Sequence, residues 1–189
     1  VETANEILTL WGTPHSLYTG KVRSYLIKKG LPFRELLPAH SEFQQRVLPS
    51  VGHMVVPVLE LANWELIQDS TEIIEILETR FPGNPMVPAT PVQACVAHLL
   101  AAFGSEGMLA PAMHYRWSYR AEQENFLRAE FGRAAHSGPN REERLAAGAR
   151  LMDYFNGFLP VLGVIPETIP AIEAAHEELL DALDIHFQH

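Results

Sequence analysis

The sequence predicts an α/β domain followed by an all-helical domain. Two observations lead to this fold class. Up to residue 83 the local signals follow the order strand, helix, strand, short helix, strand, strand, helix. After the proline-rich residues 84–90, every periodic segment has helical spacing. We therefore expect an α/β domain at 1–83, a linker at 84–90 and a helical domain at 91–189.

The first strand and helix have clear boundaries. Residues 7–11 form an apolar run that the sequence Gly-Thr-Pro at 12–14 ends, which is typical of a strand followed by a turn. A helix is expected next, with Val22 and Leu26 on successive turns and Gly30 as its C-terminal cap. Residues 33–37 predict a second strand. For 38–54 the signals are mixed, and we expect an irregular segment with one short helix near 42–48.

A hairpin and a capped helix are expected to complete the first domain. Residues 55–61 read as a strand that contains Pro57, which belongs at a strand start or a sheet edge because proline cannot donate to the ladder. Two residues separate this strand from the next, at 64–67, which favours an antiparallel hairpin. Asp69 and Glu72 then have the spacing of a capping box, and the helix they open ends at Pro82.

Four helices are expected in the second domain, at 92–103, 116–135, 141–158 and 171–187. Met108, Met113, Tyr115, Trp117 and Tyr119 fall between and along the first two. They fit either an apolar substrate pocket or an ordinary core stripe, and the sequence leaves both open.

Charge and composition exclude several classes of function. The net charge is −9 and the pI is about 5.4, and acidic residues exceed basic ones in both halves of the chain, so nucleic acid is not an expected partner. No uninterrupted apolar run approaches the ~20 residues of a membrane span, and no membrane partner is expected. The nine histidines show no metal-ligand spacing, which predicts no metal site. The single cysteine favours a reducing compartment, the cytoplasm.

Four segments together resemble the glutathione transferase superfamily, in its form with a serine-type active-site loop. They are the loop and helix at 10–23, Val-Pro-Val-Leu at 56–59, Gln-Asp-Ser-Thr-Glu-Ile-Ile at 68–74, and Thr-Arg-Phe-Pro at 79–82. The resemblance implies a thioredoxin-like N-terminal domain, an all-α C-terminal domain and glutathione as co-substrate. Family members continue beyond the last helix found here, so the resemblance also implies an incomplete C-terminal domain.

Ser16 occupies the position of the reacting group in this resemblance. At a helix N-terminus, free N–H groups and the macrodipole favour a thiolate, and a hydroxyl that donates to the sulfur would lower the pKa of the thiol further. Ser16 would then stabilise the glutathione thiolate, which is the nucleophile. A plain helix cap is the alternative role. Tyr18 is the rival donor to the thiol, unless its ring packs under the loop.

The same resemblance implies the residues that hold glutathione. A cis bond between Val56 and Pro57 would present the Val56 backbone to the cysteinyl part of glutathione. Asp69 and Ser70, at a helix start, would bind the γ-glutamyl amine and carboxylate. The family often has a polar residue two positions before the proline, where this chain has Val55, so His53 is the nearest polar substitute for binding the glycine carboxylate.

Two functions follow as hypotheses. The first is an enzyme that activates the glutathione thiol for attack on an electrophilic small molecule, with glutathione-dependent isomerisation also possible. The second is a non-catalytic relative that serves in binding or assembly, which Val55 favours. The resemblance also implies a homodimer, with residues 116–131 as the expected contact surface.

Overall fold

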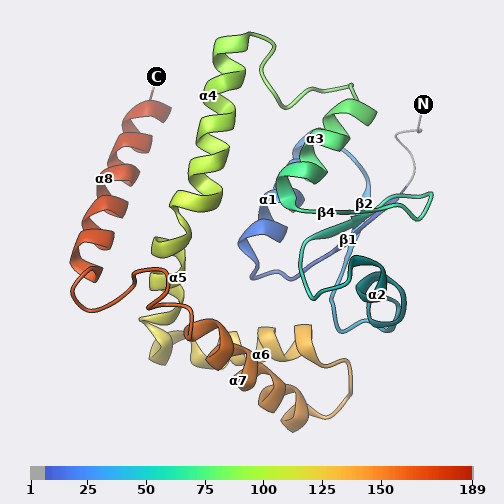
Figure 1. The fold of residues 1–189 in the computed structure, drawn as a ribbon, viewed down its shortest axis with the longest axis vertical. Coiled ribbons are helices and arrows are strands. Elements are labelled where there is room, and N and C mark those ends of the chain that lie inside the picture. The colour runs from blue at the N-terminus through green and yellow to red at the C-terminus, as the bar shows by residue number, and fades with distance from the viewer. Residues whose placement is uncertain (1–6, 189) are drawn as a thin grey trace.

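The computed structural model describes residues 7–188. Its N-terminal part is a four-stranded sheet in the order β2-β1-β3-β4, with β2 parallel to β1 and the other neighbours antiparallel. The strands are β1 (Leu8–Trp11), β2 (Phe33–Leu36), β3 (Val58–Glu60) and β4 (Leu66–Gln68). With its helices this sheet is a thioredoxin-like domain, and a helical part follows it (Figure 1). Both parts were predicted from the sequence.

Side chains alternate between the two faces of the sheet, as the strand pleat requires. On one face, Leu10 and Leu59 pack against two helices, α1 (Leu17–Lys29) and α3 (Ser70–Arg80), in a common core. On the other face, Trp11 and Val58 pack against η1 (Phe43–Val47) and α2 (Leu48–Val51). The short helix expected near 42–48 therefore begins as predicted but extends to residue 51.

The helices α1 and α3 run parallel, and two contacts along their length establish this. Lys21 Nζ lies 3.0 Å from Thr71 Oγ1 near the N-terminal ends. Lys29 Nζ lies 2.7 Å from Glu78 Oε1, about two turns further along both helices. The N-terminal ends of α1 and α3 are therefore neighbours.

The hairpin between β3 and β4 differs from the prediction by one residue. Leu61 N–H donates to Glu65 O, so three residues rather than two form the loop. The third, Trp64, has a φ of 69°, the left-handed conformation that is typical at this position of a three-residue hairpin loop. The second strand consequently begins at Leu66 and not at Trp64.

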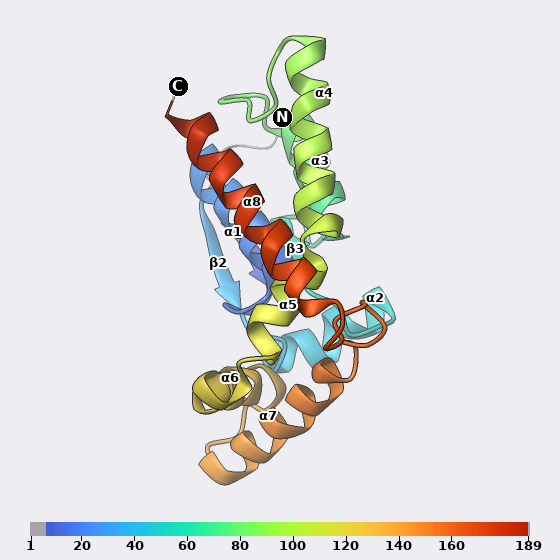
Figure 2. The same cartoon turned by 90° about the vertical axis from the view of Figure 1, so that its left-hand side faces the viewer.

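The helical part has two groups of helices. In the first, α4 (Pro91–Ala102), η2 (Phe103–Gly107) and α5 (Leu109–Trp117) follow one another along one direction. Figure 2 shows α4 and α8 (Ile169–Phe187) upright, above α6 (Arg120–Ala135) and α7 (Arg141–Asn156). A Cβ on Gly148 would stand 2.1 Å from the Arg128 carbonyl oxygen, so the close approach of α6 and α7 requires glycine there.

Two helix boundaries in this part were predicted wrongly. No helix was expected at 104–115, yet η2 and α5 span most of these residues, and α5 also includes Arg116 and Trp117. The helix expected from 116 begins only at Arg120. Met113 and Trp117 belong to the core of the helical part, whereas the rings of Tyr115 and Tyr119 stack with their centroids 6.1 Å apart. Met113 and Trp117 are therefore core residues, which is one of the two roles that the sequence left open.

The α4 helix and the first residue of η2 form an exposed apolar face. Val92, Val96, Leu99 and Phe103 are spaced four, three and four residues apart and are 75%, 50%, 64% and 47% exposed. The stretch Pro91–Trp117 reaches a mean hydropathy of 1.2 and is apolar and long enough to cross a membrane, by length and composition only. Polar residues such as His98 interrupt this stretch, so it is not an uninterrupted apolar run, although its average hydropathy stays high. The expectation of no membrane partner stays a prediction.

Candidate functional site

Ser16 caps α1, and its geometry leaves its proton available. The Thr19 N–H donates to Ser16 Oγ over 3.2 Å. A hydroxyl has one proton and two lone pairs, so Oγ can accept this bond and still donate to a ligand. The cap role and the predicted thiol-binding role of Ser16 are therefore compatible.

The loop before Ser16 is held by α1 itself. Gly12 approaches Thr19 so closely that a Cβ on residue 12 would lie 2.2 Å from the Thr19 methyl group. Thr13 O accepts bonds from Ser16 N–H at 3.1 Å and from the Arg23 guanidinium at 3.3 Å. These contacts fix the loop, and with it the main chain of Ser16, relative to the first turn of α1.

Tyr18 points toward the helical part. Its phenol donates to the Ser105 carbonyl oxygen over 3.0 Å. Burial, together with the negative charges of Glu106 and Asp69, raises the pKa of Tyr18, so the phenol stays protonated near neutral pH. In this arrangement the one proton of Tyr18 is already used, which makes Ser16 the freer donor of the two predicted catalytic residues.

Asp69 and Ser70 begin α3, next to the start of α1. Asp69 Oδ1 accepts from the N–H groups of Thr71 and Glu72 at 2.8 and 3.1 Å, which is the predicted cap. The φ of Asp69 is 70°, a strained backbone conformation of a kind that clusters at functional sites. Ser70 is 4% exposed, and its hydroxyl makes no hydrogen bond to any other described residue.

The residues near Pro57 divide into two groups. The Val56–Pro57 peptide bond is cis, and between residues 7 and 188 no hydrogen bond of the Val56 main chain is found. Val55 packs against the core that contains Trp11 and Phe43, so its position is apolar for a structural reason. His53 is exposed and, in the described part of the chain, forms no hydrogen bond or ion pair. The role of His53 in binding the glycine carboxylate thus stays a prediction.

A second contact joins the helical part to the loop. Arg116 in α5 donates to the His15 carbonyl oxygen over 2.7 Å, and the His15 ring lies on Phe131 of α6 with the centroids 4.1 Å apart. Burial, and then the positive charge of Arg116, lower the pKa of His15 to about 4, so its imidazole is neutral at physiological pH. The loop that holds Ser16 is therefore fixed from both parts of the chain.

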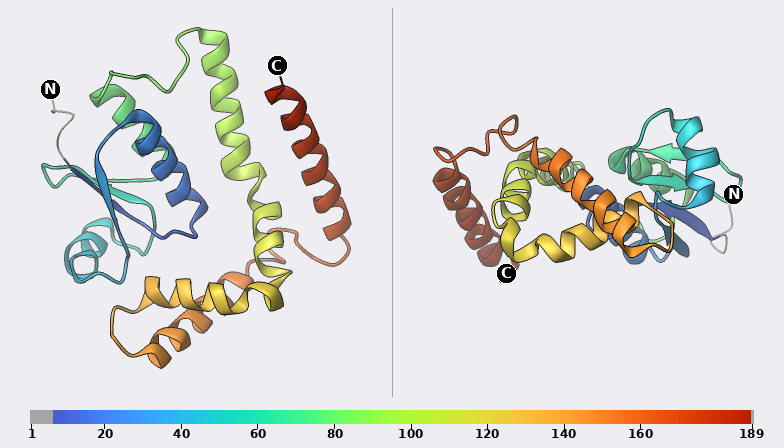
Figure 3. Two further views of the ribbon diagram at one scale, coloured as in Figure 1. Left: turned by 180° about the vertical axis from the view of Figure 1, so that it is seen from behind. Right: turned by 90° about the horizontal axis from the view of Figure 1, so that it is seen from below.

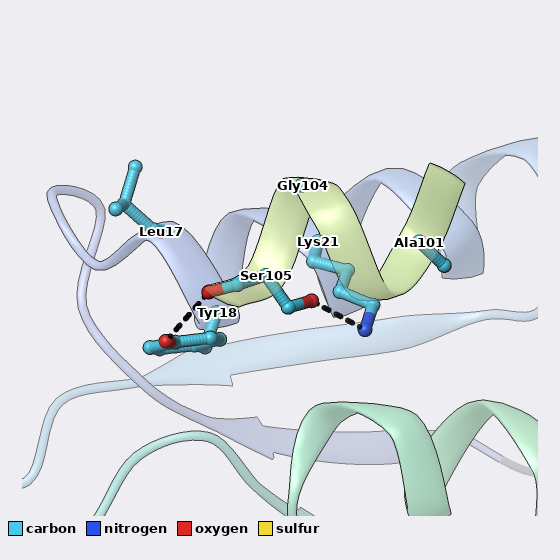
Figure 4. A pocket seen from close by; sticks show the side chains of 6 residues that line it. All are labelled: Leu17, Tyr18, Lys21, Ala101, Gly104 and Ser105. Carbon is cyan, nitrogen blue, oxygen red and sulfur yellow. Dashed lines mark hydrogen bonds between the residues drawn. The ribbon is translucent and has the colours of Figure 1, made fainter. Parts of the chain in front are cut away.

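Seen from behind, α1 is the element of the sheet domain that faces α4 and η2 (Figure 3). A pocket lies where they meet, and Figure 4 shows Tyr18 and Lys21 of α1 both directed at Ser105 of η2. Lys21, Ser105 and Arg116 had no place in the sequence-based site. They are separated from their partners by 84 to 101 residues, and no local pattern signals contacts of that kind. Among residues 7–188 no group of three or more metal-ligating side chains is found.

Residues 10–85 match the family model described as "Glutathione S-transferase, N-terminal domain". The match includes the loop before Ser16, the Val56–Pro57 bond and the start of α3. It ends before α4, so the helical part lies outside it.

Three solved structures with which the chain was compared are each 18–21% identical to it. A glutathione S-transferase from Rhodospirillum rubrum is 20% identical, with a TM-score of 0.49; the alignment covers 78% of this chain and 63% of that one, so this chain spans less than two thirds of its length. A glutathione S-transferase from Methylobacterium radiotolerans, in complex with glutathione sulfonate, is 21% identical over 92% of this chain and 90% of its own, with a TM-score of 0.44. A maleylacetoacetate isomerase from Anaeromyxobacter dehalogenans, with bound dicarboxyethyl glutathione, is 18% identical over 92% and 86%, with a TM-score of 0.41.

Proposed function

We propose that this chain is a glutathione-binding protein of the glutathione transferase superfamily and that it activates the glutathione thiol for attack on an electrophilic small molecule. One observation supports this above the others. The Lys21–Thr71 contact places the starts of α1 and α3 side by side, so the Ser16 hydroxyl and the Asp69–Ser70 pair share one end of the sheet domain. The family model matches the same segments.

Each proposed contact has a physical basis. The γ-glutamyl carboxylate would receive the Ser70 hydroxyl and N–H groups at the start of α3, and the free carboxylate oxygen of Asp69 would accept from the amine. The main chain of Val56 would pair with the cysteinyl unit. The sulfur would then lie at the start of α1, where the Ser16 hydroxyl donates to it.

In the proposed mechanism, the protein acts by stabilising the thiolate of glutathione. The thiol loses its proton to water, and the sulfur forms a bond to an electrophilic carbon, either by addition or with departure of a leaving group. Ser16 forms no bond to the substrate in this scheme. It lowers the pKa of the thiol because its hydrogen bond favours the charged form. Glutathione-dependent isomerisation would use the same thiolate.

Variants of Ser16 and Asp69 separate activation from binding. Ser16→Ala should raise the pKa of the bound thiol and slow conjugation. A hydrogen bond to a charged group contributes ~1.5–3 kcal/mol, which corresponds to a rate loss of about ten- to a hundredfold. Ser16→Thr keeps both the hydroxyl and the cap and is the matched control. Asp69→Asn keeps the cap but removes the charge, so it should weaken glutathione binding with less effect on the reactivity of the bound thiol.

Calorimetry with glutathione and ultraviolet titration of the bound thiolate measure the two effects. Should Ser16→Ala leave the thiol pKa unchanged, Tyr18→Phe becomes the deciding variant. If that variant is silent as well, the conjugating activity is refuted.

A non-catalytic role in binding or assembly is the second candidate. The packing of Val55 in the core and the exposure of His53 favour it, because neither residue offers an evident contact to the glycine carboxylate. Glutathione that binds without a shift of its thiol pKa would support this role. A cytoplasmic location stays a prediction.

The partner surface that we propose for a homodimer is α4 and not residues 116–131. In that segment, Trp117, Leu127 and Phe131 are buried in the protein's own core. The accessible surface of the chain is 11432 Å², against roughly 9,000 Å² for a compact monomer of this mass. An excess of this size is in the range that a stable dimer interface buries, and the exposed residues of α4 have the spacing of a helix-pairing seam.

A further inference from the structure

The pocket between α1 and η2 is built from both parts of the chain. It has a volume of about 340 Å³ and is lined by Leu17, Tyr18, Lys21, Ala101, Gly104 and Ser105. Leu17 and Tyr18, which Figure 4 shows at the pocket, follow Ser16 directly in the sequence, so we expect the pocket to adjoin the proposed thiol site. A molecule in this pocket would lie next to the sulfur.

Most of the pocket wall is apolar or small. Leu17 is 46% exposed even though it is apolar, and Ala101 adds a second methyl group. Gly104 leaves space, since outside its chain neighbours and the backbone of its own helix no atom stands within 4 Å of the point where its Cβ would be. These features favour a ligand with an apolar body.

Lys21 provides the one cationic side chain among the residues that line this pocket. Its Nζ lies 3.0 Å from Thr71 Oγ1 and 3.1 Å from Ser105 Oγ, and no carboxylate of the described residues forms an ion pair with it. By contrast, Arg23 and Lys29 of the same helix are paired with Glu35 and Glu78.

The place of this cation is unfavourable without an anion. Thr71 belongs to the first turn of α3, and the N-terminal end of a helix carries partial positive charge, which repels an ammonium group. Asp69 offsets part of this charge, but its Oδ1 already accepts from two main-chain N–H groups. An anionic group bound beside Lys21 and Ser105 would satisfy the ammonium.

We propose that this pocket binds an electrophile with an apolar body and a carboxylate, and that Lys21 receives the carboxylate. This inference rests on the proposed function. The carboxylate is assigned to the electrophile rather than to glutathione for two reasons. Ser70 and the start of α3 already supply donors to the γ-glutamyl carboxylate, and the glycine carboxylate is expected beyond Val56, on the side of His53.

A matched pair of electrophiles tests the assignment. 4-(Chloromethyl)benzoate and its methyl ester have the same reacting carbon and differ in charge. In both, the sulfur–carbon bond forms as the carbon–chlorine bond breaks, chloride leaves with the electron pair, and the thiol proton goes to water. The ratio of kcat/KM for the acid to kcat/KM for the ester should fall about tenfold in Lys21→Gln. A tenfold change corresponds to the lower end of the free-energy range for a hydrogen bond to a charged group. Lys28→Gln, an exposed position on the same helix, should leave the ratio unchanged, and Lys21→Arg should restore most of it.

A binding measurement decides the inference without catalysis. Calorimetry on the glutathione-loaded protein, with unreactive 4-methylbenzoate and its methyl ester, should show a preference for the acid that Lys21→Gln removes. An unchanged preference overturns the assignment, as does a loss of glutathione affinity without any change in preference, because Lys21 would then bind glutathione. If neither chloromethyl compound is conjugated but the preference for the acid depends on Lys21, the proposed conjugating activity is refuted and the carboxylate site is supported.

Discussion

Replacing Lys29 by methionine should lower the free energy of unfolding by about 2–3 kcal/mol. The Lys29 side chain is 0% exposed, and its Nζ lies 2.7 Å from Glu78 Oε1. The same carboxylate accepts from Tyr25 Oη at 2.6 Å and from the Met86 N–H at 3.1 Å. Lys29 thus neutralises a carboxylate that links α1, α3 and the segment before α4.

The magnitude follows from what remains after the substitution. Removing one partner of a buried ion pair costs about 3–5 kcal/mol, because the other charge is left buried. Glu78 keeps two donors and its side chain is 16% exposed, so water reaches it and the loss should lie at or just below the lower end of this range. Methionine is unbranched and replaces most of the lysine stem. For a chain of this size the melting temperature should fall by about 5–10 °C.

The effect should depend on pH in a defined direction. Burial raises the pKa of Glu78, but the hydrogen bonds from Lys29, Tyr25 and Met86 outweigh it and lower the pKa overall. A carboxyl with a depressed pKa in the folded state stabilises the protein above its unfolded pKa, and this stability is lost as the pH falls. The difference between Lys29→Met and the wild type should therefore shrink as the pH falls through about 4.

Urea unfolding followed by circular dichroism measures these differences. Lys28→Met changes an exposed neighbour and should stay within about 0.5 kcal/mol of the wild type. The double variant with Glu78→Gln should recover part of the loss, since it leaves no buried charge. If Lys29→Met is as stable as Lys28→Met at pH 7, the reasoning is refuted.

Two further predictions concern the loop and the partner surface. Because the pKa of His15 is lowered to about 4 in the folded protein, the unfolded chain binds a proton between pH 6.5 and 4 that the folded one does not, and stability should fall over that range. The melting temperature of His15→Phe should therefore depend less on pH over this range than that of the wild type. An equal dependence on pH in the two proteins would contradict the assignment. The wild type should be a dimer by light scattering at micromolar concentration, and Leu99→Glu a monomer; a wild type found only as monomer removes the proposed interface.

The sequence predicted correctly those features of the fold that depend on residues close together in the chain. The cap at Asp69, the cap at Ser16 and the end of α1 at Gly30 each depend on residues within four positions of one another. The strand order could be expected because short connections and one crossover leave few alternatives. These features are the ones that position the proposed glutathione contacts.

The missed features depend on glycine-rich or distant segments. The two glycines at 104 and 107 lower helix propensity, yet that segment continues as η2 and α5. Lys21 and Arg116 gained roles only when the fold brought η2 and the loop against α1 and α5. No periodicity within a sequence window can report a contact across a hundred residues.

The hydrogen bonds from Tyr18 and Arg116 between the two parts share one property: each ends on a main-chain carbonyl, that of Ser105 or that of His15. A carbonyl is present whatever side chain the residue carries. Positions 15 and 105 can therefore accumulate substitutions during evolution without loss of these two anchors, while the donors Tyr18 and Arg116 cannot. A domain contact of this kind would let the side chains beside the proposed thiol site change while the placement of the loop is inherited unchanged.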